Sequence, residues 1–269
     1  MQSIAEIQER IRANLKNPQA LALSYEESLQ RRVDSYNAGE GDLPLYDCAI
    51  CKNKGHIAVV MDGYEAMKEC KCMDIRRGIQ RIEKSGLSET LRECTFDNYI
   101  ANDEWQRKIK AFAERFTEEQ NPAWFYIGGQ VGAGKTHICT AIVGKFLNAG
   151  KAAHYMLWRD ESVRLKATVN NDEEYDKAIT PLKTVDVLYI DDFFKTERGK
   201  SPTTADINLA FEILNYRYNN RNLITIISSE RSMDELVDID EAVGSRIYQR
   251  AKGYGLHISH SRDKNYRLS

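Results

Sequence analysis

The most constraining feature of the sequence is a glycine-rich loop between a short apolar segment and a helical one. Trp124–Ile127 form the apolar segment, and His137–Leu147 have the periodicity of a helix. The loop has the pattern G-x-x-x-x-G-K-T, which in a strand–loop–helix context is typical of a phosphate-binding loop. The residues expected to bind nucleotide here are Gly129, Gly132, Gly134, Lys135 and Thr136.

Each residue type in this loop has a chemical role in binding phosphate or Mg²⁺. Glycines let backbone N–H groups curl around phosphates, and the N-terminus of the following helix adds a favourable dipole. Lys135 is expected to reach the β- and γ-phosphates, and the Thr136 hydroxyl to bind Mg²⁺. The sequence therefore predicts a site for ATP with Mg²⁺.

A second apolar segment, Val185–Ile190, ends in two carboxylates, Asp191 and Asp192. In a parallel sheet this end lies at the carboxyl edge, where ligands bind. Asp191 is expected to hold Mg²⁺ through water, and Asp192 to orient or deprotonate the attacking water. The alternative is two solvated aspartates that end a strand. Strands alternating with helices predict an α/β fold with a parallel sheet.

A third segment, Leu223–Ile227, leads to further polar residues. Ser229 and Glu230 are candidates to contact the γ-phosphate or the attacking water; the alternative is a helix cap followed by a surface glutamate. Arg246 lies in a later helical segment. It is a candidate to reach the γ-phosphate of a neighbouring subunit, and the alternative is a surface arginine.

Four of the six cysteines form two close pairs. The pairs flank a predicted hairpin, in which strand His56–Val60 is followed by an Asp62-Gly63 turn. Such a ribbon brings four thiolates onto one structural Zn²⁺, with His56 as a substitute ligand. The alternative is four ordinary reduced cysteines, and Cys94 and Cys139 are expected to be buried structural thiols. The predicted zinc ligands are Cys48, Cys51, Cys70 and Cys72.

The remaining N-terminal sequence predicts two amphipathic helices, Ile4–Leu15 and Tyr25–Tyr36, the second with Leu29 and Val33 on its apolar side. We expect four segments along the chain. They are an N-terminal helical segment (1–45), a zinc-binding module (46–75), a basic linker helix (76–93) and the nucleotide-binding domain (94–269).

Composition limits the partners. No apolar run is long enough to span a membrane, and the start does not resemble a signal peptide, so we expect a cytoplasmic protein. The net charge is −2, so any nucleic-acid contact must come from a local patch. One candidate patch is the loop 193–200, which combines Phe193 and Phe194 with basic residues. A second contains Arg246, Arg250, Lys252, Arg262, Lys264 and Arg267. The alternative for each is a solvated face. Arg159–Tyr175 has no assignable role.

Taken together, these motifs resemble those of AAA+ ATPases in order and spacing. More narrowly, the chain is similar to the DnaC/DnaI helicase loaders of bacteria and their phages, which are related to the IstB transposition ATPases. The resemblance implies a three-layer ATPase domain after a helical and zinc-ribbon-like module. It makes Asp191 and Asp192 the Walker B acids, places Ser229 or Glu230 near sensor 1, and makes Arg246 the arginine finger.

Two departures from the general AAA+ pattern affect the expected activity. The second Walker B acid is Asp192 rather than glutamate, whose longer side chain reaches further. Residues 247–269 are too few for a C-terminal helical lid, which DnaC-like members also lack. We therefore expect weak ATP hydrolysis by the isolated protein.

The resemblance also implies the partners. Loaders bind a DnaB-type replicative helicase, usually through their N-terminal region, and deliver it to single-stranded DNA, so assembly into an oligomer with the helicase is expected. The two N-terminal helices are candidates for the helicase contact, or they pack on the chain's own zinc module. Alternative functions are an IstB-like transposition ATPase, a small-molecule kinase and a non-hydrolysing ATP-binding adaptor.

Overall fold

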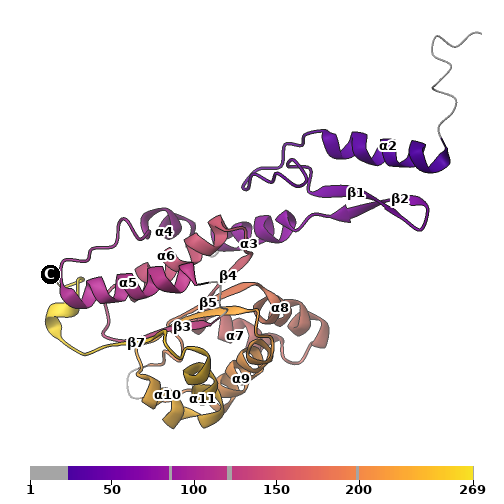
Figure 1. Cartoon of the computed structure of the whole chain (residues 1–269). Helices are drawn as coiled ribbons and strands as arrows, with labels where there is room; N and C mark the ends of the chain where they lie inside the picture. Colours follow the sequence, from indigo (N-terminus) through magenta and orange to yellow (C-terminus); the bar gives the residue numbers. More distant parts are fainter. Residues whose placement is uncertain (1–23, 85–86, 120–122, 198–199, 269) are drawn as a thin grey trace, which may run out of the picture. The chain divides into compact units, whose positions relative to one another are not determined.

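The computed structural model describes residues 24–84, 87–119, 123–197 and 200–268, and the predicted helix Ile4–Leu15 lies outside these ranges. The chain divides into two compact units, Met1–Met73 and Asp74–Ser269 (Figure 1). The division into four segments stays a prediction. Within the described ranges, every helix is too short or too polar to cross a lipid bilayer.

The first unit contains one described helix and a β-hairpin. Ser24 and Glu27 form a capping box that starts the helix. The two antiparallel strands are joined by Asp62 and Gly63, whose φ angles of 50° and 78° suit a two-residue hairpin turn. The predicted hairpin is therefore confirmed. The elements are α2 (Tyr25–Ala38), β1 (His56–Met61) and β2 (Tyr64–Glu69).

The apolar side of helix α2 is buried within this unit. Leu29 and Val33 are buried, with exposed fractions of 1% and 5%. Asn37 fixes the helix to β1, because its side chain donates to the Ala58 carbonyl and accepts from the Ala58 N–H, both at 2.9 Å. The sequence left two alternatives for this helix, a contact with the helicase or packing on the chain's own zinc module. Its apolar face packs on its own module.

The second unit is built on a five-stranded sheet in the order β4-β5-β6-β3-β7, in which all neighbours are parallel. Side chains alternate between its two faces. Trp124 and Tyr126 of β3 enter one core, whereas Phe125 and Ile127 enter the other. The strands are β3 (Trp124–Gly129), β4 (Ala153–Leu157), β5 (Val187–Asp191), β6 (Ile224–Ser228) and β7 (Gly255–Ile258).

Helices cover both faces of this sheet (Figure 1). One face carries α4 (Leu87–Glu93), α5 (Glu104–Glu118) and α6 (Lys135–Asn148). The other carries α7 (Trp158–Thr168), α8 (Asp172–Thr184), α9 (Thr204–Asn219), α10 (Met233–Ile239) and α11 (Glu241–Arg250). The chain also contains α3 (Cys72–Lys84) and a single 3-10 turn, η2 (Arg262–Lys264). The predicted three-layer α/β fold with a parallel sheet is confirmed.

Two regions without a predicted structure contain regular elements. The segment Arg159–Tyr175 is helical for most of its length, in α7 and the start of α8. The strands β4 and β7 were not predicted, because both lie at edges of the sheet and lack a continuous buried apolar run: two of the five residues of β4 and one of the four residues of β7 are buried.

A buried arginine ties the second layer of helices to the sheet. Arg217 of α9 is fully buried, and burial lowers its pKa to about 9. Its guanidinium donates to the Thr225 hydroxyl at 2.9 Å and to the carbonyls of Val185 at 2.9 Å and Ile224 at 2.6 Å. It also donates to the carbonyls of Leu182 and Lys183.

Replacing Arg217 with Met is expected to lower the free energy of unfolding by about 3 kcal/mol, because several buried acceptors then lose their donor. For a domain of this size the melting temperature should fall by roughly 6–12 °C. Thermal unfolding followed by circular dichroism measures the change. Arg221→Ala, at an exposed position soon after α9, is the control and should leave the melting temperature unchanged. An unaltered melting temperature in Arg217→Met would contradict the assigned role.

Candidate functional site

The glycine-rich loop lies between β3 and α6, at the carboxyl end of β3, which pairs with β6 on one side and β7 on the other. Gly134 has a φ of 81° and caps α6, in a left-handed conformation that favours glycine. Gly132 has a φ of 72°, and the side chain of Asn265 lies where its Cβ would be. Backbone N–H groups at a helix N-terminus in this conformation suit an anionic phosphate.

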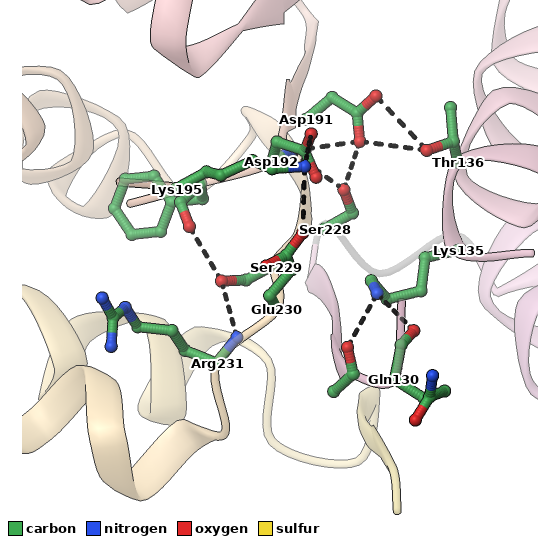
Figure 2. A network of polar contacts seen from close by, with 12 residues as sticks. Gln130, Lys135, Thr136, Asp191, Asp192, Lys195, Ser228, Ser229, Glu230 and Arg231 are labelled. Carbon is green, nitrogen blue, oxygen red and sulfur yellow. Dashed lines mark hydrogen bonds and ion pairs between the residues drawn. The ribbon is translucent and has the colours of Figure 1, made fainter. Parts of the chain in front are cut away.

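Lys135 turns back over this loop (Figure 2). Its Nζ donates to the carbonyls of Gly129 at 2.8 Å and Gln130 at 2.7 Å. Burial lowers the pKa of Lys135, and the nearby carboxylates of Glu230 and Asp192 oppose this shift. The ammonium group is thus already among the residues expected to surround the phosphates.

Asp191 is the centre of the polar network in Figure 2. It ends β5, is only 4% exposed, and accepts from the Thr136 hydroxyl at 3.3 Å and 3.4 Å. It also accepts from the hydroxyls of Tyr155, at 3.1 Å, and Ser228. A hydroxyl and a carboxylate in contact at the mouth of a phosphate-binding loop are suitable ligands for Mg²⁺.

Asp192 and Glu230 share one cation. Lys195 places its Nζ 2.8 Å from the Asp192 carboxylate and 2.9 Å from that of Glu230. Asp192 has a φ of 53°, so the chain leaves β5 in a left-handed turn that directs its side chain to this pair. The structure thus brings together Asp192, predicted to orient or deprotonate water, and Glu230, predicted to contact the γ-phosphate or the water, but holds both in ion pairs.

The two serines at the end of β6 differ in position. Ser228, which the sequence analysis did not select, donates to the Asp191 carboxylate and accepts from the Asp192 N–H at 3.2 Å. Ser229, which it selected, donates to the Phe193 carbonyl at 2.8 Å. The structure therefore brings Ser228 to the site and turns Ser229 away. The register between β5 and β6 would have identified Ser228. Ile190 pairs with Ile227, so the residues that follow, Asp191 and Ser228, lie side by side.

The cavity beside the loop has a volume of about 240 Å³. Arg246 is not part of it. Its guanidinium donates to Asn215 at 3.1 Å and lies 4.8 Å from the centre of the Phe211 ring, on α9. The structure thus does not bring Arg246 to the nucleotide cavity of its own subunit, and its role as an arginine finger stays a prediction. The cavity is lined by Val131, Gly132, Gly134, Lys135, Thr136, His137, Asp192, Lys195, Glu230 and Arg267.

One predicted nucleic-acid patch is corrected. Phe193 and Phe194 are fully buried, stack on each other at 4.1 Å, and pack against Trp158 at 4.9 and 5.4 Å. The prediction that these aromatic rings face nucleic acid is therefore wrong, because core burial outweighs exposure. They instead fix the loop that carries Lys195.

The four paired cysteines form a buried cluster in the first unit, with all sulfurs within 4.8 Å of one another. Two sulfur pairs, Cys48–Cys70 and Cys51–Cys72, are 3.8 Å and 3.4 Å apart. A tetrahedral zinc site with bonds of about 2.3 Å separates its sulfurs by about 3.8 Å, so the cluster fits zinc.

The thiol of Cys51 has the electrostatics of a metal ligand. Burial raises its pKa, but the N–H of Gly55, at 3.3 Å from the sulfur, and the Cys72 thiol outweigh burial and bring the pKa to about 6. The thiolate is the form that binds metals. Outside the cluster, Cys139 is fully buried as expected, and Cys94 is half-buried.

Comparison with known proteins places this site in a family. Residues 91–253 match the family described as the bacterial DnaA ATPase domain. The phage-like element PBSX protein XkdC of Bacillus subtilis is 31% identical over 80% of this chain and 83% of its own length. The chain belongs to the DnaA/DnaC family of AAA+ ATPases. Membership of this family implies a capacity to bind and hydrolyse ATP.

Other relatives match over less of their length. YqaM of Bacillus subtilis is 33% identical over 75% of this chain, and the match covers 66% of YqaM. The replicative helicase loader DnaC of Escherichia coli strain K12 is 30% identical over 46% of this chain and 51% of its own length. The chain thus spans about half to two thirds of these relatives.

Solved structures agree on the fold. A crystal structure of the DnaC helicase loader superposes with a TM-score of 0.53 at 18% identity, covering 64% of this chain and 99% of that one. The initiator DnaA bound to AMPPCP and single-stranded DNA gives 0.51 at 21% identity, covering 64% and 51%. These likenesses support the AAA+ architecture of the second unit.

Proposed function

We propose that this AAA+ ATPase is a helicase loader, which binds a DnaB-type replicative helicase and delivers it to single-stranded DNA during replication. The observation that carries the proposal is the contact between Thr136 and Asp191 beneath the phosphate-binding loop, in a chain similar to DnaC. This is the arrangement by which an NTPase holds Mg²⁺ against its nucleotide. ATP then acts as a switch for assembly and release as much as a source of energy.

The residues of this chain have separate tasks in that reaction. Lys135 and the loop N–H groups would bind the phosphates, and Thr136 with Asp191 would hold Mg²⁺, which would supply positive charge to the phosphates. Ser228 orients the Asp191 carboxylate. Asp192 and Glu230 are placed to orient water, once their ion pairs with Lys195 loosen. Arg246 would act from a neighbouring subunit of an oligomer.

The remaining surfaces have proposed partners. Since α2 buries Leu29 and Val33 against its own module, its apolar side is not the helicase contact. We assign that contact to other parts of residues 1–45. For single-stranded DNA, the exposed basic side chains Lys252 and Arg262 are the remaining candidates from the C-terminal patch, since Arg267 lines the nucleotide cavity.

A second candidate function is a non-hydrolysing ATP-binding adaptor. The observation that favours it is Lys195, which engages both acids that could activate water. An adaptor would bind ATP and its partner without turnover, even with helicase and single-stranded DNA present. Turnover that requires Asp192 would exclude it.

The test is co-migration with the host replicative helicase in size-exclusion chromatography, with ATP and with ADP. We expect a nucleotide-sensitive complex that Lys135→Ala abolishes, because loss of the ammonium removes the contact with the β- and γ-phosphates. Lys145→Ala, at an exposed position on the same helix, is the matched control and should behave as wild type. If no complex forms in any nucleotide state while ATP still binds, the loader proposal fails and a transposition partner becomes the next candidate.

A further inference from the structure

The Asp191 carboxylate is bound by hydroxyl groups from three elements of the ATPase domain. Ser228 of β6 donates to its Oδ1, and Tyr155 of β4 donates to its Oδ2 at 3.1 Å. The Thr136 hydroxyl of α6 lies 3.3 Å and 3.4 Å from the two oxygens. The proposed function gives tasks to Thr136 and Ser228, so the Tyr155 hydroxyl is the donor without an assigned task.

Strand register explains how Tyr155 reaches this carboxylate. The strands β4 and β5 pair in parallel, with Tyr155 opposite Tyr189 and Leu157 opposite Asp191. Alternate residues of a strand share a face, so Tyr155 lies on the same face as Asp191 but two residues, about 7 Å, behind it. Leu157, directly opposite, has no polar group to donate. The contact therefore needs a long side chain with a terminal donor, which tyrosine provides.

Packing fixes the ring that carries this hydroxyl. The centre of the Tyr155 ring lies 5.3 Å from that of Tyr189, which is fully buried. The half-buried Tyr155 side chain packs against the same core as Tyr189, which also contains Ile138 and Cys139 of α6. A ring held in this way has already lost its rotamer freedom when it makes the hydrogen bond. The position of the Tyr155 hydroxyl is thus set by the core.

The two oxygens of Asp191 have different partners. Oδ1 accepts from Ser228 and from the Asp192 N–H, the latter at 3.1 Å. Contacts to one oxygen restrain a carboxylate weakly, because the torsion about its Cβ–Cγ bond has broad preferences. Thr136 is almost equally distant from both oxygens and does not select an orientation. The shorter hydrogen bond from Tyr155 to Oδ2 does select one, so a donor on each oxygen fixes the plane of the group.

The orientation of a carboxylate matters most to a metal with strict geometry. Mg²⁺ requires nearly ideal octahedral coordination, whereas Ca²⁺ accepts irregular coordination. We infer that Tyr155 is a positioning residue for Mg²⁺, whose hydroxyl holds the Asp191 carboxylate in one orientation for the metal that accompanies the nucleotide. The inference rests on the proposed function and deepens it, because it names a residue outside the nucleotide cavity on which that Mg²⁺ site depends.

The experiment measures binding of AMPPNP to this chain by isothermal titration calorimetry, in EDTA, with Mg²⁺ and with Ca²⁺. The ratio of the dissociation constant in EDTA to that with a metal gives the contribution of the metal. Tyr155→Phe keeps the packed ring and removes the hydroxyl. It is expected to lower the Mg²⁺ ratio about tenfold or more, as for other partners that orient a metal ligand. The affinity in EDTA should stay unchanged, and the Ca²⁺ ratio should fall less than about threefold.

Tyr248→Phe is the matched control. Tyr248 is exposed on α11, so this variant loses a tyrosine hydroxyl away from the site and should match wild type under all three conditions. Tyr155→Phe should remain folded at the temperature of the titration, which thermal unfolding checks.

Three outcomes would overturn the inference and leave the loader proposal standing. An unchanged Mg²⁺ ratio in Tyr155→Phe would make the hydroxyl purely structural. An equal loss of affinity in EDTA and with Mg²⁺ would place the effect on the phosphate-binding loop instead of the metal. Equal losses with Mg²⁺ and Ca²⁺ would exclude geometry as the cause. If the wild-type chain bound no nucleotide in any condition, the proposed function would fail together with the inference.

Discussion

Removal of zinc from this chain is expected to unfold the hairpin module and leave the ATPase domain folded. The first unit has a small described core, with Leu29, Val33 and Ala58 as its buried aliphatic side chains besides the cysteine cluster. A structural zinc ion contributes about 10–16 kcal/mol of apparent binding free energy in small metal-dependent modules. The second unit has two large cores of its own, so its stability does not depend on the metal.

The measurement combines metal analysis with amide hydrogen exchange before and after a strong chelator. We expect one zinc per chain, and loss of protection in β1, β2 and α2 after chelation. Cys51→Ser should give the same result, whereas Cys94→Ser, outside the cluster, should retain zinc and protection. A protected hairpin in the metal-free chain would show that the four cysteines are ordinary thiols.

The sequence predicted those parts of the molecule that depend on short-range pattern. Gly129–Thr136 specify a loop through their own backbone preferences, and the strand before them is apolar at every position because helices cover both faces of the sheet. The hairpin followed from the Asp62-Gly63 turn, and the cysteine cluster from the spacing of its pairs. Each of these signals lies within a few residues of what it specifies.

The features that were missed depend on residues far apart in the chain. Choosing Ser228 over Ser229 requires the register between β5 and β6. The burial of Phe193, in the turn after β5, depends on Trp158 of helix α7, so an aromatic pair beside basic residues was misinterpreted as a nucleic-acid surface. Arg267 was predicted only as part of a basic stretch, because its place in the cavity depends on contacts of its segment with α5 and the loop.

The second large effect is expected at Asp191. Asp191→Asn keeps the shape of the side chain but removes the negative charge that, with Thr136, is placed to hold Mg²⁺. We expect the rate of Mg²⁺-dependent ATP hydrolysis to fall about 100- to 1000-fold. The rate is measured by phosphate release in the presence of helicase and single-stranded DNA, since turnover by the isolated chain is expected to be weak.

A control variant and a measurement of ATP binding without Mg²⁺ are needed to interpret the rate of Asp191→Asn. Asp176→Asn, at an exposed position on α8, makes the same chemical change away from the site and should hydrolyse ATP at the wild-type rate. Binding of ATP without Mg²⁺ should be little affected in Asp191→Asn, because the loop and Lys135 remain. A wild-type rate in Asp191→Asn would mean that the Thr136–Asp191 contact is structural and that metal is held elsewhere. Normal Mg²⁺-free binding with lost turnover would assign this carboxylate to the metal, as its contact with Thr136 leads us to expect.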